Sequence, residues 1–238
     1  MVHMDTILFD MDGTLIDTEG YYNRCWVQAI REAGFSITNE RALELRSLGR
    51  PFACDWFLRE FGAQADYQAI RSRRKELMNE LMKREGLRLM PGANELLETV
   101  KASGLRAVIA TATDLERTEQ YLSELGIAHY FDQLICATMV KQGKPAPDIY
   151  LYACSQANRR PEACVAVEDS PNGVRSAAAA GCRVIMVPNQ SQPDEELNRL
   201  IWKKADSLSV LHQWILDGTL FDCQRSGSVP KVCAGRIG

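Results

Sequence analysis

The chain has little of what would mark several common classes of protein. Only three of its 238 residues are histidine, so a metal site built from several histidines has little support. No apolar run approaches the roughly 20 residues that a membrane-spanning helix needs. The residues around Asp5 do not have the pattern of a secretory leader. The formal net charge of −3 gives no reason to expect nucleic acid or an anionic membrane as a partner.

The eight cysteines lack the spacing of a disulfide framework and include no Cys-x-x-Cys pair. Several lie in apolar runs, as in Leu134-Ile135-Cys136. We therefore expect buried, reduced thiols and a cytoplasmic protein. Hydrophobic residues make up 46% of the chain, which is enough for one large domain or a core domain with a smaller companion.

A short apolar run near the start of the chain ends in two aspartates. Ile7-Leu8-Phe9 predicts a strand buried on both faces, and Asp10-Met11-Asp12-Gly13-Thr14 follows it. Gly13 predicts a turn. Two carboxylates that leave a buried strand together repel each other unless a cation or a proton separates them. An Asp-Gly pair is often only a loop, but the full pattern arises by chance in about one such chain in several hundred.

The rest of the chain predicts an α/β fold. Helical spacing fills four segments after the first strand, at 18–33, 38–46, 51–61 and 66–85. From Pro91 onward, helices and strands alternate. The predicted strands are 105–111, 131–136, 163–168 and 182–187, and the predicted helices are 92–103, 114–125, 146–157, 171–180 and 208–216. This order predicts a doubly wound parallel-sheet, Rossmann-like core with an inserted all-helical cap domain.

The expected domains follow from this pattern. Residues 1–17 and 88–221 form the catalytic core, and residues 18–87 form the helical cap. Residues 222–238 form a tail in which no periodicity is visible. Ligands of doubly wound folds bind beyond the carboxyl ends of the strands. The cap therefore stands over the expected site.

The polar residues at the predicted strand ends, and in the loop before helix 146–157, form one chemical set. Carboxylates, a hydroxyl and an ammonium group together suit a hard cation held beside an anion. The set comprises Asp10, Asp12, Thr111, Lys144, Glu168 and Asp169. Each has an ordinary explanation when taken alone, such as a solvated loop lysine or a helix cap. Their joint occurrence favours the chemical interpretation.

This set suits phosphoryl transfer with Mg²⁺. Asp10 and Asp169 supply side-chain ligands, and Asp12 supplies a backbone carbonyl. Asp10 is the candidate nucleophile, because a carboxylate can form an aspartyl-phosphate. Asp12 is the candidate acid and base. Thr111 and Lys144 can stabilise the charge of the transferring group.

These motifs resemble those of the haloacid dehalogenase superfamily. The resemblance rests on Asp10-Met11-Asp12-Gly13-Thr14, Thr111, Gly143-Lys144-Pro145 and Glu168-Asp169-Ser170-Pro171-Asn172-Gly173, and it covers about residues 5–216. The insertion and the segment Lys144-Pro145-Ala146-Pro147-Asp148-Ile149-Tyr150 are similar to the β-phosphoglucomutase-like subfamily, which has a helical cap. The resemblance implies a magnesium-dependent phosphatase or phosphotransferase. It implies metal roles for Asp10, Asp12 and Asp169, supported by Glu168.

Several activities fit this resemblance. A dehalogenase that attacks carbon does not need Asp12, so phosphoryl transfer is favoured. β-Phosphoglucomutase has a cap histidine one helical turn after a motif like Asp17-Thr18-Glu19, and ungapped matching puts Tyr22 there. Tyrosine cannot make the same cationic contact at neutral pH. We therefore predict a phosphatase acting on a small phosphomonoester such as a sugar phosphate or phosphoglycolate. A mutase, or a catalytically silent binding module, is the alternative.

The cap is expected to select the substrate, because its closure completes the site. Arg50 lies where relatives place a substrate-contacting arginine, although a solvated arginine at a helix start fits as well. The candidate substrate-binding residues are Arg50, Thr18, Tyr22 and Thr113, and Glu19 lines the same entry.

A basic run on the last predicted cap helix is expected to be mostly a solvated face. It comprises Arg71, Arg73, Arg74 and Lys75, of which Arg73 and Lys75 are the candidates to reach the cleft. The expected partner is a small phosphorylated metabolite, with no nucleic acid and no membrane. The expected assembly is a monomer or weak dimer.

Overall fold

A six-stranded parallel sheet organises the computed structural model, which describes residues 4–220. The predicted tail, 222–238, lies outside these residues. The strand order is β3-β2-β1-β4-β5-β6. The strands are β1 (Thr6–Phe9), β2 (Arg106–Thr111), β3 (Gln133–Cys136), β4 (Cys164–Glu168), β5 (Arg183–Met186) and β6 (Lys203–Lys204). The predicted doubly wound fold is confirmed.

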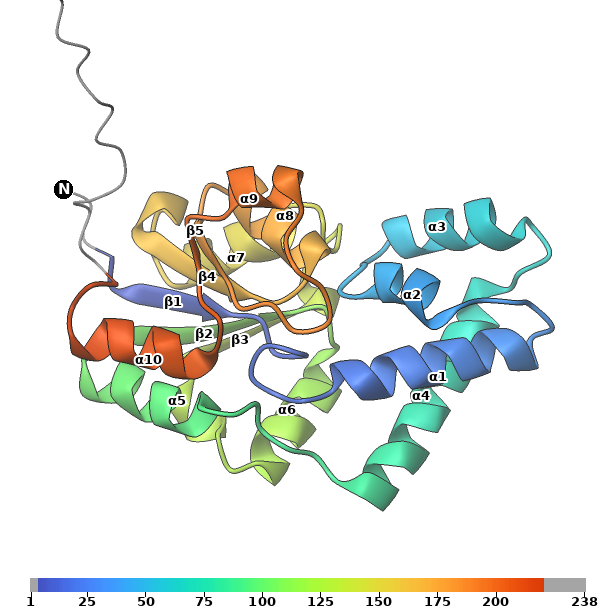
Figure 1. Ribbon diagram of the computed structural model, residues 1–238, viewed down its shortest axis with the longest axis horizontal. Coiled ribbons are helices and arrows are strands. Elements are labelled where there is room, and N and C mark those ends of the chain that lie inside the picture. Colours follow the sequence, from blue (N-terminus) through green and yellow to red (C-terminus); the bar gives the residue numbers. More distant parts are fainter. Residues whose placement is uncertain (1–3, 221–238) are drawn as a thin grey trace, which may run out of the picture.

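Helices cover both faces of the sheet (Figure 1). One face carries α5 (Ala93–Ala102), α6 (Leu115–Glu124) and α10 (Leu208–Leu216), and the other carries α7 (Asp148–Gln156), α8 (Pro171–Ala179) and α9 (Glu195–Leu200). Single 3-10 turns η2 (Ala128–Tyr130), η3 (Ala137–Met139) and η4 (Pro161–Ala163) lie in the connections.

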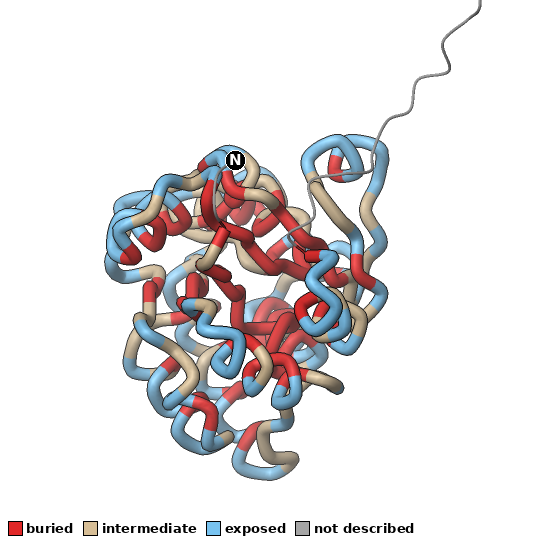
Figure 2. The backbone as a smooth tube through the Cα atoms, turned by 90° about the vertical axis from the view of Figure 1, so that its left-hand side faces the viewer, coloured by how far each residue is buried: buried red, intermediate tan, exposed pale blue. Residues whose placement is uncertain are grey.

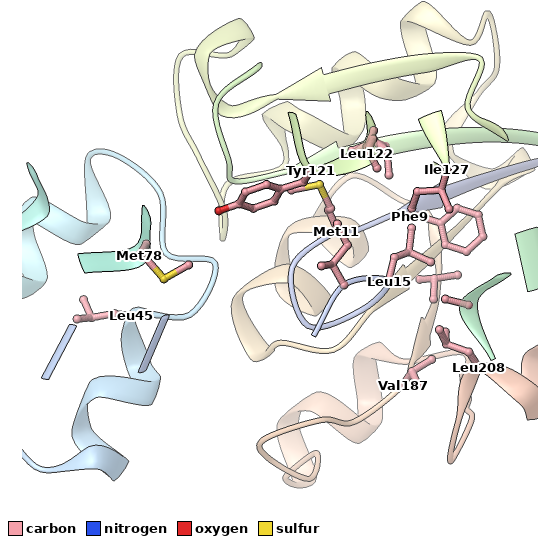
Figure 3. Packing of buried hydrophobic residues seen from close by; sticks show 14 of the residues in the cluster. Phe9, Met11, Leu15, Leu45, Met78, Tyr121, Leu122, Ile127, Val187 and Leu208 are labelled. Atoms are coloured by element: carbon pink, nitrogen blue, oxygen red, sulfur yellow. The ribbon is translucent and has the colours of Figure 1, made fainter. Parts of the chain in front are cut away.

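The side chains of β1 pack alternately into two hydrophobic layers, because successive side chains of a strand point to opposite faces. Phe9 belongs to the layer under α5 and α10 and lies beside Leu122, Ile127 and Leu208 (Figure 3). Leu8 belongs to the layer under α7 and α8. The strands are therefore buried on both sides, as the red segments through the sheet show in Figure 2. This burial holds the carboxyl ends of β1, β2 and β4 at fixed positions.

Four helices are inserted between β1 and α5, and they stand beyond one end of the sheet (Figure 1). These inserted helices are α1 (Glu19–Glu32), α2 (Asn39–Ala42), α3 (Phe52–Phe61) and α4 (Tyr67–Glu85), with the turn η1 (Leu43–Leu45) after α2. Leu45 and Met78 pack among them, apart from the group around Phe9 (Figure 3). Trp26 contacts Phe57, with ring centroids 5.5 Å apart.

The predicted elements are present with small shifts at their ends, and two elements were missed. The predicted helix 38–46 is shorter, since it changes to a 3-10 turn at Leu43. α9 has only six residues and β6 only two, too few for a periodic pattern. α9 nevertheless has a cap signal, since the Asp194 side chain accepts a hydrogen bond from the backbone of Leu197. No helix within residues 4–220 is both long and apolar enough to cross a membrane.

Candidate active site

The candidate site lies where the strand order changes direction. β1 is flanked by β2 and β4, and the chain reaches these two neighbours by crossovers in opposite directions. Asp10 follows β1, Thr111 ends β2, and Glu168 ends β4. A cleft lies at this edge of the sheet, and Asp10, Asp12, Thr111 and Lys144 line it. We call these four residues, together with the adjoining Glu168 and Asp169, the sheet side of the cleft. All six are buried.

Lys144 joins the carboxylates of two strands. Its ammonium group lies 2.6 Å from Glu168 Oε1 and also donates to Asp10 Oδ1. Tyr150 on α7, which the sequence did not single out, donates to the same Glu168 oxygen at 2.6 Å. Burial alone would lower the pKa of Lys144, but the charges of Asp10 and Glu168 raise it above its usual range. The lysine therefore stays charged and neutralises this part of the sheet side.

Two carboxylate oxygens remain unsatisfied beside this lysine. Asp10 Oδ2 and Asp169 Oδ2 are buried and accept no hydrogen bond from the described residues. Oxygens of Asp10, Glu168 and Asp169 lie within 4.8 Å of one another. Burial is the main cause that raises the pKa of both Asp10 and Asp169. Gly13 (φ +83°) lets the Asp169 carboxylate approach the β1 loop closely, since a Cβ there would lie 2.5 Å from Asp169 Oδ2 and 2.4 Å from Glu19 Cγ. This donor set fits a small hard cation.

Asp12 is held by hydroxyl groups. Thr18 donates to its Oδ1 at 2.7 Å and Thr113 to its Oδ2 at 2.7 Å, and Thr111 lies 3.5 Å from Oδ2. The Tyr22 hydroxyl lies 3.2 Å from that of Thr113. Burial raises the pKa of Asp12. Three of the residues predicted to touch substrate, Thr18, Tyr22 and Thr113, are therefore connected to Asp12.

The opposite wall of the cleft is basic. We define the helical side of the cleft as four arginines from the inserted helices and their connections: Arg46, Arg50, Arg71 and Arg74. Arg46, which the sequence analysis did not identify, is buried with its Nη1 3.5 Å from Asp169 Oδ2 and its Nη2 2.6 Å from Ser191 Oγ. Its Nε lies 4.0 Å from Glu19, which also lines the cleft.

The basic run on α4 is arranged differently from the prediction. Arg73 points outward to Glu32, 2.7 Å away, so its expected place in the cleft is wrong. Lys75 lines the cleft, paired with Asp114 at 2.8 Å. Arg74 is buried in the cleft wall. Helical spacing could have shown this, because position 74 shares a face with the buried residues Ile70, Leu77, Met78 and Leu81.

The inserted helices meet the sheet through two loops in backbone contact. The Gly49 N–H donates to the Lys144 carbonyl at 2.8 Å, and the Gly143 N–H donates to the Arg50 carbonyl at 2.8 Å. A Cβ at Gly49 would lie 2.5 Å from the Gly143 Cα, so the approach requires glycine. This contact places Arg50 next to the loop that carries Lys144, and both line the cleft.

Residues 4–181 match the family described as haloacid dehalogenase-like hydrolases. The chain belongs to this family. As a haloacid dehalogenase-like hydrolase it is an enzyme, and the predicted family is confirmed. Hexitol phosphatase A of Escherichia coli is 34% identical over 213 residues, which cover 87% of this chain and 94% of that protein.

Solved structures of other haloacid dehalogenase-like proteins share the fold. A putative β-phosphoglucomutase from Bacteroides vulgatus has a TM-score of 0.78 and 27% identity, covering 93% of this chain and 92% of that one. A mutant of CbbY from Rhodobacter sphaeroides, solved in complex with xylulose-(1,5)bisphosphate, has a TM-score of 0.73 and 31% identity, covering 87% of this chain and 95% of that one. A relative with the same fold as this hydrolase is thus known with a phosphorylated sugar bound.

Proposed function

We propose that this hydrolase is a Mg²⁺-dependent phosphatase that cleaves a small phosphomonoester, of the sugar phosphate or phosphoglycolate type, through an aspartyl-phosphate on Asp10. The observation that carries the proposal is that Asp10 and Asp12, two neighbouring aspartates, have different hydrogen-bond partners. Asp10 keeps one oxygen free beside Lys144. Asp12 is held in place by hydroxyls and has a raised pKa. The first arrangement suits a nucleophile and the second suits an acid.

In the first step, Asp10 Oδ2 forms a bond to phosphorus while the ester P–O bond breaks. Asp12 gives its proton to the leaving oxygen. In the second step, water attacks phosphorus, its proton goes to Asp12, and the Asp10–phosphorus bond breaks to release phosphate. Lys144 balances the charge of the transferring group, and the Thr111 hydroxyl donates to a phosphoryl oxygen. Burial of Asp12 supports its role, because a raised pKa keeps the acid form available closer to neutral pH.

Asp10 and Asp169 would hold Mg²⁺ with the Asp12 backbone carbonyl, and Glu168 would support the site by holding Lys144. The ion would neutralise phosphoryl oxygens and orient the ester. The carboxylate oxygens of Asp10, Glu168 and Asp169, which lie within 4.8 Å of one another, support this assignment. We expect Mg²⁺ to raise the melting temperature of the native chain, and Asp169→Asn to lose most of that shift. An equal shift in both proteins would reject the assignment.

We propose the predicted domain division as the functional one, with residues 18–87 as the cap over a core of 1–17 and 88–221. Thr18, Tyr22 and Thr113 orient Asp12, and Arg50 contacts the substrate from the cap. The backbone contact between the Arg50 loop and the Lys144 loop supports this role for Arg50.

The test is phosphate release from a panel of sugar phosphates and phosphoglycolate with Mg²⁺. We expect Asp10→Asn to lower kcat by at least about a thousandfold, because the nucleophile is lost. Asp17→Asn changes an exposed aspartate on the same segment and serves as the matched control. Equal rates for the native chain and Asp10→Asn would reject the mechanism.

A mutase is the second candidate, favoured by the similarity to a putative β-phosphoglucomutase. Sustained interconversion of β-glucose 1-phosphate and glucose 6-phosphate with little net hydrolysis would identify it. Tyr22, at the position of the mutase histidine, supports the phosphatase instead.

A further inference from the structure

We propose that the substrate carries a second anionic group, a phosphate or a carboxylate, and that Arg74 binds it. This inference rests on the proposed phosphatase function and names the substrate class for the same cleft.

Arg74 is a buried cation with no acidic partner among residues 4–220. Its relative exposure is 7%, and its Nε is buried without a hydrogen bond. The guanidinium carbon lies 5.0 Å from the ring centre of Tyr22 and 5.0 Å from that of Trp26. Contacts with ring faces stabilise the charge in part. They leave the buried Nε–H without an acceptor, and a buried charge without an ionic partner is costly.

The surroundings of Arg74 supply more positive charge. Burial is the main cause that lowers the pKa of Arg74, and the charges of Arg71 and Arg117 lower it further. Arg117 donates to two neutral partners, Asn79 and Tyr121. Arg50 and Lys141 line the same cleft. These positive charges outnumber the carboxylates whose charge reaches them, Asp12 and Asp114, and neither carboxylate forms a salt bridge with Arg74.

Each acidic residue that lines the cleft has a cation or a hydroxyl group other than Arg74 beside it. These residues are Asp10, Asp12, Glu19 and Asp114. Asp10 contacts Lys144, Asp114 pairs with Lys75, and Glu19 faces Arg46. Asp12 accepts from threonine hydroxyls. A carboxylate or phosphate of the ligand is therefore the missing partner, and a guanidinium edge fits either group with two parallel hydrogen bonds.

The position of Arg74 also fits the size of a small metabolite. The Tyr22 ring connects the two ends of the cleft, since its face contacts Arg74 and its hydroxyl contacts Thr113, which donates to Asp12. One aromatic ring thus separates the cation from the group beside the reacting ester. A short sugar-like carbon chain can place one anion at Asp10 and another at Arg74.

The main experiment compares matched esters in initial-rate assays. The set pairs glucose 6-phosphate with 6-phosphogluconate and with glucose 1,6-bisphosphate, and pentose phosphates with their bisphosphates. We expect native kcat/KM to favour the esters with a second anion by about ten- to a hundredfold. Arg74→Met should remove that preference mainly through KM. The control Arg73→Gln, from the exposed face of the same helix, should keep it.

The outcomes separate the two proposals. Hydrolysis of para-nitrophenyl phosphate reports the phosphatase chemistry without a second anion, so its absence together with inactivity on every ester rejects the proposed function. Hydrolysis without a preference for doubly anionic esters overturns only the inference. The same holds if Arg74→Met lowers kcat/KM for both kinds of ester in equal proportion. Preference for 6-phosphogluconate or for the bisphosphates identifies the second group as a carboxylate or a phosphate.

A stability measurement keeps the proposal testable if rates are low. Because the buried charge is unpaired without ligand, Arg74→Met should melt at the same temperature as the native chain or higher. A loss of several degrees would show that the protein itself satisfies the arginine, and the inference would fail.

Discussion

The two sides of the cleft treat charge in opposite ways. On the sheet side, Lys144 is fully buried and bonded to two carboxylates, and three threonine hydroxyls lie around Asp12. On the helical side, Arg74 is buried beside aromatic rings and other arginines. The sheet side is thus largely complete before a substrate arrives, apart from two oxygens suited to a cation. On the helical side, Arg46 already has protein partners, and the partner of Arg74 is supplied by what binds. This difference indicates that the residues for the reaction lie at the edge of the sheet, whereas residues that recognise the substrate lie on the inserted helices.

The largest expected difference in stability is between two variants that each remove one buried cation, Lys144 on the sheet side and Arg74 on the helical side. Lys144→Met leaves Asp10 and Glu168 buried without their counter-charge, so the free energy of unfolding should fall by about 3–5 kcal/mol. Urea denaturation measures this change. Arg74→Met, the same replacement on the helical side, should cause no such loss. Equal destabilisation of the two variants would break the comparison.

A smaller effect is expected from a single methyl group. A Cβ at Gly173 would lie 2.0 Å from the Glu168 carboxylate, so Gly173→Ala must displace the group that holds Lys144. We expect a loss of about 1–3 kcal/mol together with reduced phosphate release. Gly20 on α1 has nothing within 4 Å of its Cβ position, and Gly20→Ala should stabilise by up to about 1 kcal/mol. Thermal unfolding of both variants checks the pair, and a stable, fully active Gly173→Ala would contradict the prediction.

The smallest effect tests the connection between the two sides. Tyr22→Phe removes the hydroxyl that reaches Thr113, at a cost of about 1 kcal/mol in stability. Tyr21→Phe on the same helix removes a bond to the Gly86 carbonyl and should cost a similar amount. Only Tyr22→Phe should also lower kcat, because Thr113 orients Asp12. If kcat falls equally in both variants, Tyr22 has no particular role in orienting the acid.

The sequence predicted the sheet side well because its residues sit at strand ends. A parallel sheet brings the carboxyl ends of its strands to one edge, so Asp10, Thr111 and Asp169 could be joined from the order of elements alone. Tyr150 was missed because it lies inside a helix, at a position that periodicity assigns to the core. Its hydroxyl partner, Glu168, belongs to another element.

The helical side was harder to predict because the direction of a side chain on a helix depends on the exact position of its residue in the turn. Within the run 71–75, a step of one residue turns the side chain by about 100°, which separates the outward Arg73 from the inward Arg74. Arg46 ends the predicted helix 38–46, but a 3-10 turn replaces the last part of that helix, so helical spacing did not give the direction of its side chain. Composition could indicate that this region was basic. The buried face of α4 was needed to show which arginine enters the cleft.

The paired glycines at positions 49 and 143 also set a limit on what the enzyme can admit. Their loops touch backbone to backbone, so no side chain can be added at either position without driving the helices away from the sheet. Any such substitution would enlarge the cleft at Asp10. The absence of a side chain at Gly49 and Gly143 therefore limits the length of the molecule that fits in the cleft.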